Sequence, residues 1–284
     1  MKSPPLSVRC MADKIPCSVP ILTLNCKAAL ERMLPVLVPV IQDVYILDGN
    51  STDDTRDYAR SLGVRIEKQF DTDEPNQRIT DFYAMRMRLW SKAQTDWLFL
   101  LDADEIPTPE LIDRVREIVT ENNPMVVHRF RRIARLPDGR IVKHAFFYPD
   151  LYIRLFNTTS GATLAKRAVH ERFVLPEGVK EIDHVEALIA PWPSPQKLWE
   201  KSKRYVSMET ENIQPTWKYL WRWVIFYNLR SAVGQMLRVI ACYWRGFTRR
   251  ETVLPWAYNI RMIGYRYLHL TMGIKAWIVK RKTI

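Results

Sequence analysis

Short apolar segments alternate with longer segments of mixed polarity over the first 120 residues. Each apolar segment contains several β-branched or aromatic residues, which favours a β-strand. The predicted strands are Ser18–Leu24, Val44–Leu47, Val64–Glu67 and Trp97–Leu101. Helical character is found between them at residues 27–41, 55–62 and 76–94, and again from Pro107 to about Thr120. Strands and helices that alternate in this way form a mostly parallel sheet covered by helices, so this part of the chain predicts an α/β fold.

After residue 126 the pattern changes to short β-like runs separated by polar residues, up to about residue 174. Such runs predict hairpins or a mixed sheet added to the parallel strands. From about Pro195 onward the sequence is helical in character and rich in aromatic residues. We therefore expect a flexible tail at residues 1–17, one α/β domain at residues 18–195, and a helical region at residues 196–284.

Two apolar and basic segments make up most of this C-terminal region. Residues 217–245 are strongly apolar but contain five Lys or Arg residues, which do not fall on one stripe of a regular helix. We therefore expect two shorter helices here, broken near Gly234 or at a kink. A second aromatic and basic segment, Trp256–Lys282, is expected to pair with the first.

Positive charge is concentrated in the same region. The chain carries 43 Lys and Arg against 31 Asp and Glu, a net charge of +12, and residues 197–284 alone carry 17 against 4. Seven of the ten Trp residues also lie there. Cations combined with Trp and Tyr are typical of a segment that lies on an anionic membrane surface. A nucleic-acid-binding patch and a helical bundle with solvated basic faces are the alternatives. The membrane surface is favoured, with no nucleic acid partner.

Several further features limit the class and location of the protein. Its four Cys residues form no CxxC pair and are too few for a disulfide scaffold, which indicates a reducing compartment. The first ten residues lack the apolar core of a secretory signal. The chain also contains no uncharged apolar run of about 18 residues, so no transmembrane helix is predicted. We expect a cytoplasmic protein, peripheral on the inner face of the cell membrane. The sequence does not define its oligomeric state.

Acidic residues follow two of the predicted strands. Asp48 ends the second strand, and Asp102 and Asp104 follow the apolar run WLFLL. In parallel α/β sheets, ligands bind at the carboxyl ends of the strands, so these side chains are expected at one site. Carboxylate oxygens suit Mg²⁺ or Mn²⁺, and such a cation usually keeps diphosphate oxygens among its ligands. For Asp102 and Asp104, the alternative is a solvated turn that caps the next helix.

Five segments, in this order, resemble the motif set of glycosyltransferase family 2: PILTLN, ILDGNSTDDT, DWLFLLDADE, YPDLYIRLF and AVHERF. The likeness spans roughly residues 18–210 and is strongest to small bacterial enzymes that add a sugar to lipopolysaccharide core or related glycans. It implies a GT-A fold and an inverting, metal-dependent transfer from a nucleotide-sugar, with UDP favoured as the nucleotide. The expected acceptor is a hydroxyl of a membrane-borne glycan or glycolipid. A polyprenyl phosphate or a protein is the alternative acceptor.

The resemblance also assigns roles to individual residues. Those implied at the nucleotide pocket are Thr23, Asn25, Asp48, Gln77, Arg78 and Asp102. Asp48 would bind the uracil or ribose, and Gln77 or Arg78 would contact the base or the diphosphate. The implied metal ligands are Asp104, Asp102 and His184, with Glu105 supporting them or the sugar. The chain departs from the family pattern at Cys26, where a Glu commonly follows the Asn.

Inversion requires a base that deprotonates the acceptor hydroxyl on the face opposite the leaving group. The resemblance favours Glu171, in AVHERF, for this role. Asp150, in the segment YPD, is the second candidate. A structural alternative stays open for each residue: an exposed carboxylate for Glu171, and a turn residue after Pro149 for Asp150.

Simple sequence features test whether the chain belongs to another functional class of protein. The chain lacks the glycine-rich motifs of dinucleotide-binding and P-loop proteins. A sugar nucleotidyltransferase shares the α/β layout and the paired acids, but would be expected to carry a glycine-rich N-terminal loop, which is absent here. A non-catalytic membrane- or nucleic-acid-binding protein on a degenerate GT-A core would need neither metal nor donor. Metal-dependent UDP binding that requires Asp104 distinguishes the enzyme from that module.

Overall fold

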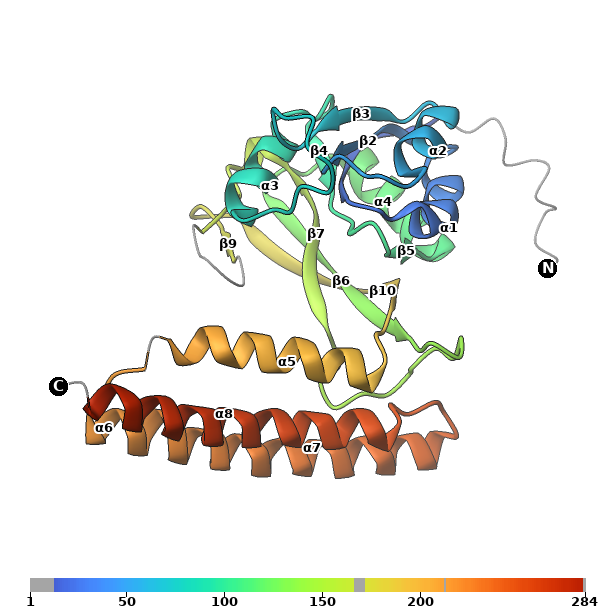
Figure 1. Cartoon of the computed structure of the whole chain (residues 1–284). Coiled ribbons are helices and arrows are strands. Elements are labelled where there is room, and N and C mark those ends of the chain that lie inside the picture. Colours follow the sequence, from blue (N-terminus) through green and yellow to red (C-terminus); the bar gives the residue numbers. More distant parts are fainter. Residues whose placement is uncertain (1–12, 166–171, 212, 283–284) are drawn as a thin grey trace. The chain divides into compact units, whose positions relative to one another are not determined.

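The computed structural model describes residues 13–165, 172–211 and 213–282 (Figure 1). The chain divides into two compact units. Unit 1 comprises the residues up to 132 together with residues 149–190, and unit 2 comprises residues 133–148 together with residues 191 onward. Residues 133–148, which the sequence analysis placed in the α/β domain, therefore group with the C-terminal helices.

Four parallel strands form one half of the sheet in unit 1. They are β1 (Ile15–Thr23), β2 (Ile41–Asp48), β3 (Arg65–Lys68) and β4 (Trp97–Phe99), in the order β3-β2-β1-β4. The connecting helices are α1 (Lys27–Leu37), α2 (Thr55–Ser61) and α3 (Phe82–Trp90). The predicted alternation of strands and helices is confirmed, and it brings the carboxyl ends of these strands to one edge of the sheet.

Antiparallel pairs extend the sheet beyond β4. β7 (Leu151–Asn157) pairs with β4, and β6 (Val126–Arg135) pairs with β7. β10 (Lys180–Pro191) and the short β5 (Ile106–Pro107) complete the order β7-β6-β10-β5, and α4 (Pro109–Glu121) follows β5. After β7 come a short 3₁₀ turn, η2 (Thr158–Ser160), and a two-stranded sheet of β8 (Thr163–Leu164) and β9 (Phe173–Val174). The predicted mixed sheet after residue 126 is thus confirmed.

Alternate side chains of the central strands enter two apolar clusters on opposite faces of the sheet. On β2, Val44 and Ile46 belong to one cluster, whereas Tyr45 and Leu47 belong to the other. The first cluster includes the buried faces of α1 and α4, and the second includes that of α3. Because helices cover both faces, the central strands read as nearly continuous apolar runs in the sequence.

Three predicted boundaries in unit 1 were wrong. The helix expected at residues 76–94 is only α3, because Asn76 has a left-handed backbone (φ 57°) and the Asp81 carboxylate caps the helix by accepting from the Ala84 N–H. The helix expected at residues 27–41 ends at Leu37, and Ile41 already belongs to β2. The first strand begins at Ile15, within the segment predicted to be a tail.

Unit 2 is built mainly from helices: α5 (Pro195–Thr210), α6 (Trp217–Tyr219), the π-helical η3 (Leu220–Phe226), α7 (Tyr227–Arg249) and α8 (Trp256–Lys282). α8 packs against both α5 and α7, so the predicted pairing of the two basic segments is confirmed (Figure 1). Glycine allows the close approach, since a Cβ at Gly264 would lie 2.9 Å from the Trp199 ring. The predicted break at Gly234 was wrong, because α7 runs through it and the irregular turn lies earlier, at η3. No helix in the described part of the chain is both long enough and apolar enough to span a bilayer.

Candidate active site

The ends of β1 and β2 are joined by a buried hydrogen-bond network around Asp48. The Thr23 hydroxyl donates to Asp48 Oδ2 (2.8 Å), as does the Ser51 hydroxyl (2.6 Å), and the Ser51 N–H donates to Oδ1 (2.8 Å). Asp48 is only 2% exposed. The carboxylate therefore shapes the turn that follows β2. A uracil or ribose that binds Asp48 would have to share the carboxylate oxygens of Asp48 with these donors.

Three loops meet beside this turn through asparagine side chains. Asn25 Oδ1 accepts from the Thr52 N–H (2.8 Å), and Asn25 Nδ2 donates to Asn76 Oδ1 (2.6 Å). Asn50 Nδ2 donates to the carbonyl oxygens of residues 72 and 74. Asn25, Asn50 and Asn76 all have positive φ, a conformation that asparagine tolerates better than most residues. From the sequence alone, these asparagines could be recognised only as polar residues typical of loops, and the contacts between the loops could not.

A cavity of about 430 Å³ opens beside these loops and has an acidic lining. Its residues are Asn50, Ser51, Thr52, Asp53, Asp54, Arg56, Asp57, Asp73 and Pro75. Such a lining suits hydrogen-bond donors such as ribose hydroxyls or a base N–H better than it suits phosphates. Gln77 and Arg78 lie on the adjoining loop, where the Gln77 N–H donates to the Gly49 carbonyl and Arg78 is exposed. Gly49 permits this contact, because a Cβ there would be 2.6 Å from the Gln77 oxygen.

Asp102 and Asp104 lie just beyond the carboxyl end of β4, on a loop that also carries Glu105. The Asp102 side chain is half-exposed, with Arg86 3.7 Å from Oδ1 and Arg154 4.0 Å from Oδ2. Asp104 reaches the surface, but the surrounding protein removes part of its hydration. That desolvation, followed by the negative charge of Asp102, raises the pKa of Asp104. The negative charge of Asp102 therefore acts on Asp104, and a shared cation stays a prediction for this pair.

Glu105 and Arg154 form a buried ion pair beneath this loop. Arg154 Nη2 donates to Glu105 Oε1 (2.5 Å), and the Asp102 N–H donates to Oε2 (3.0 Å). Glu105 is 1% exposed, and burial raises its pKa although the Arg154 charge opposes the shift. Glu105 therefore anchors the backbone of Asp102 from inside the protein. The sequence did not reveal Glu105 as the partner of Arg154, although Arg154 belongs to the motif segment YPDLYIRLF.

The two candidate bases differ in what the structure shows of them. Asp150 Oδ2 accepts from Arg132 Nε (3.0 Å), and the Arg132 guanidinium lies 4.8 Å from the centre of the Tyr152 ring. Asp150 is therefore held in an ion pair. Glu171 lies outside the described residues. Arg132 also acts electrostatically on Asp104 and Glu105, so Asp150 belongs to the same charged neighbourhood.

His184 is placed with His128 rather than in a group with the two aspartates. His184 Nε2 lies 2.9 Å from His128 Nδ1, its ring stacks on Phe130 at 4.7 Å, and its Nδ1 is 4.0 Å from Glu186. Across residues 13–165, 172–211 and 213–282, no three His, Cys, Asp or Glu side chains are grouped so that they could hold a metal ion.

This histidine pair predicts that acid destabilises the protein. Burial, followed by the charge of His184, lowers the pKa of His128 to about 4, below the value of about 6.5 in the unfolded chain. The unfolded state then binds more protons than the folded state between these values. His128 therefore contributes stability above pH 6.5 that is lost as the pH falls toward 4, in total about 3 kcal/mol.

Urea unfolding of the wild type and of His128→Phe at pH 7, 5.5 and 4 tests this expectation. The variant should lose less unfolding free energy between pH 7 and pH 4 than the wild type, whatever its stability at neutral pH. The same pH dependence in both proteins would show that His128 does not carry the effect.

Comparison with known proteins places the site within a family. The sequence model described as Glycosyl transferase family 2 matches residues 18–173, more than half of the chain. Among solved structures, S. aureus TarS (residues 1–349) in complex with UDP is similar, with a TM-score of 0.43 and 11% identity over 94% of this chain and 92% of that chain. Glucosyl-3-phosphoglycerate synthase from Mycobacterium tuberculosis, in complex with Mn²⁺, UDP and glucosyl-3-phosphoglycerate, is similar with a TM-score of 0.32 and 20% identity. That match covers 42% of this chain and 44% of the synthase chain. The matched part thus spans less than half of the synthase. Since both scores are below 0.5, the assignment rests on the family match.

Proposed function

Since the chain belongs to glycosyl transferase family 2, we propose that it is an inverting, metal-dependent enzyme that moves a sugar from a UDP-sugar to a hydroxyl of a membrane-borne glycan or glycolipid. The observation that carries the proposal is the pair Asp102 and Asp104 on one loop at the carboxyl end of β4, where the negative charge of Asp102 acts on Asp104. Ligands of parallel α/β sheets bind at this edge.

The residues present fit a divalent cation. Asp102 and Asp104 offer oxygen ligands, and the pKa of Asp104 is raised by desolvation and then by the negative charge of Asp102. Mg²⁺ is often held by one or two carboxylates with phosphate oxygens and water as its other ligands, so this pair is sufficient. A cation held there would supply Lewis-acid stabilisation of the charge on the departing diphosphate. His184 stays a prediction as a third ligand.

The chain's own residues hold the donor site in shape. Glu105 fixes the Asp102 backbone through its Oε2, and Arg154 keeps Glu105 in place. Asp48 orders the turn after β2, and the acidic cavity next to it offers acceptors for the ribose and uracil. Thr23 ends β1, Asn25 follows it, and Gln77 and Arg78 lie on the loop before α3. None of the four lines this cavity, and their contact with the nucleotide stays a prediction from the family resemblance.

We assign the base to Glu171, which would take the proton of the acceptor hydroxyl during attack on the anomeric carbon. Asp150 is the alternative. Its ion pair with Arg132 holds the carboxylate in place, which favours a positioning role for Asp150 over proton transfer.

The acceptor is proposed from the charge of the C-terminal region. Residues 197–284 carry 17 Lys and Arg against 4 Asp and Glu, which suits an acceptor presented at an anionic membrane surface, such as lipopolysaccharide core on the cytoplasmic side. A polyprenyl phosphate would present the same negative surface, whereas a protein acceptor would not require it.

A screen of donor hydrolysis tests the proposed function. The purified protein is incubated with UDP-, GDP- and dTDP-sugars, with Mn²⁺ or with EDTA, and release of the nucleoside diphosphate is measured. We expect release from a UDP-sugar with Mn²⁺, loss of release with EDTA, and recovery when Mn²⁺ is restored. Release from no donor under any condition, or release that EDTA leaves unchanged, would contradict the proposal.

A further inference from the structure

One solvent-exposed stripe of α7 is apolar along the length of the helix. Eight large apolar residues of η3 and α7 are among the most exposed in the chain, with Trp244 69% and Phe247 80% exposed. They are Phe226, Leu229, Val233, Met236, Leu237, Ile240, Trp244 and Phe247, here called the α7 row. Apart from the adjacent Met236 and Leu237, they follow one another at intervals of three or four residues, and all eight lie within an arc of about 100° on one helical face. A water-facing helix normally carries polar residues there.

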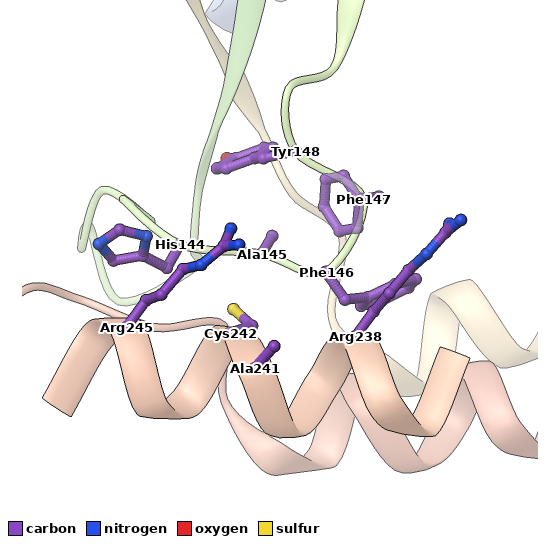
Figure 2. A pocket seen from close by; sticks show the side chains of 9 residues that line it. All are labelled: His144, Ala145, Phe146, Phe147, Tyr148, Arg238, Ala241, Cys242 and Arg245. Carbon is purple, nitrogen blue, oxygen red and sulfur yellow. The ribbon is translucent and has the colours of Figure 1, made fainter. Parts of the chain in front are cut away.

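The opposite side of α7 is the one that packs within unit 2. Asn228, Val239, Cys242 and Gly246 are buried. Between these two faces, Arg238, Ala241, Cys242 and Arg245 line a cavity of about 320 Å³ together with residues 144–148. Figure 2 shows the two arginine side chains rising from α7 beside the 144–148 loop. α7 is thus apolar toward solvent, buried on its inner face, and basic along one flank.

The positive charge around the α7 row indicates an anionic partner for this surface. From residue 212 to the end of the chain there are 13 Lys and Arg and one acid, Glu251, which pairs with His144 (2.5 Å). Within the part of the chain that the structure describes, no carboxylate forms an ion pair with Arg238 or Arg245. Apolar side chains with cations beside them match the acyl region and phosphate layer of an anionic bilayer. A second copy of this chain would bring like charges together, and a nucleic acid would gain nothing from the α7 row.

We propose that α7 lies in the plane of an anionic membrane, with the α7 row inserted below the phosphates and with Arg238 and Arg245 binding lipid phosphate groups at its flank. The inference deepens the proposed function, since it identifies the surface by which the enzyme would reach a membrane-borne acceptor. It assigns anchoring to one helical face of unit 2, rather than to the C-terminal basic charge in general.

Vesicle co-sedimentation of the full chain tests both parts. Phosphatidylcholine vesicles, with and without phosphatidylglycerol, are titrated with wild type, Trp244→Gln/Phe247→Gln, Arg238→Gln/Arg245→Gln and the control Val174→Gln/Val185→Gln. The control changes two exposed apolar residues of unit 1. We expect the row variant to bind mixed vesicles about 100-fold more weakly than wild type. The arginine variant should lose about 30-fold on mixed vesicles and much less on phosphatidylcholine alone. The control should bind as wild type.

Three results would overturn the proposal: wild-type affinity in the row variant, an equal loss in the control, or a loss in the arginine variant that is the same on both vesicle types. Sedimentation equilibrium could give a fourth contradicting result: the wild type is a dimer that does not bind vesicles, and the row variant is a monomer. Donor hydrolysis without vesicles should be the same in all variants. Absence of hydrolysis in the wild type as well would count against the proposed function, while vesicle binding would still decide the role of α7.

Discussion

Replacing Asp104 by asparagine is expected to lower the turnover of sugar transfer by about 10³-fold, because the carboxylate that we propose as a ligand of the cation at the diphosphate is lost. Asparagine keeps the size of the side chain and removes its charge. The change also relieves repulsion with Asp102, so the folded protein should be at least as stable as the wild type. Release of the nucleoside diphosphate from a UDP-sugar at saturating Mn²⁺ is the measurement.

Asp138→Asn provides the matched control for this substitution. Asp138 is an exposed aspartate of unit 2 that pairs with Arg140, so its loss should leave turnover unchanged. Turnover of Asp104→Asn within tenfold of wild type, with thermal unfolding unchanged, would contradict the assigned role of Asp104.

Loss of the proposed base, Glu171, should produce the second large effect. Glu171→Gln is expected to lower transfer to the acceptor by 10²- to 10⁴-fold, the usual range for a general base. Asp150→Asn should have a smaller effect, because Asp150 is held in its ion pair with Arg132. Donor binding should survive in both variants, since neither residue is assigned to the nucleotide.

The pH profile of transfer separates the two candidates. If Glu171 is the base, its glutamine variant loses the acidic limb of the profile and Asp150→Asn keeps it. The opposite outcome, with a lost limb in Asp150→Asn and near wild-type transfer in Glu171→Gln, would move the role to Asp150.

The central sheet was predictable because its physical cause is local in the sequence. Strands buried on both faces are apolar throughout, as in β4, and the intervening helices begin at capping residues such as Thr108, which accepts from the Leu111 N–H. The acidic residues after β2 and β4 follow from the same pattern, since parallel strands present their carboxyl ends together.

Features that depend on distant contacts were not predictable. Residues 133–148 have strand-like sequence, but their apolar side chains pack with Leu254 and Tyr258 of the C-terminal region. Gly234 has low intrinsic helix propensity, yet α7 continues through it because packing within unit 2 outweighs one residue's preference. The long helix expected before β4 was shortened by the cap at Asp81.

In the candidate site, too, the features set by local sequence were predictable and those set by distant contacts were not. The sequence identified Asp102 and Asp104 from their place after a buried strand. It did not reveal that Glu105 is buried with Arg154, because the two residues are 49 positions apart and meet only through the pairing of β4 with β7. The partners of Asp150 and His184, Arg132 and His128, were likewise hidden by sequence distance.

Isothermal titration of UDP, with and without Mn²⁺, tests most directly whether Asp102 and Asp104 hold a cation at the diphosphate. Wild type, Asp104→Ala and the control Asp138→Ala are compared. We predict that Mn²⁺ tightens UDP binding to the wild type and to the control, and that this gain is absent in Asp104→Ala. Equal UDP binding by the wild type with and without Mn²⁺, or a full Mn²⁺ effect in Asp104→Ala, would contradict the account.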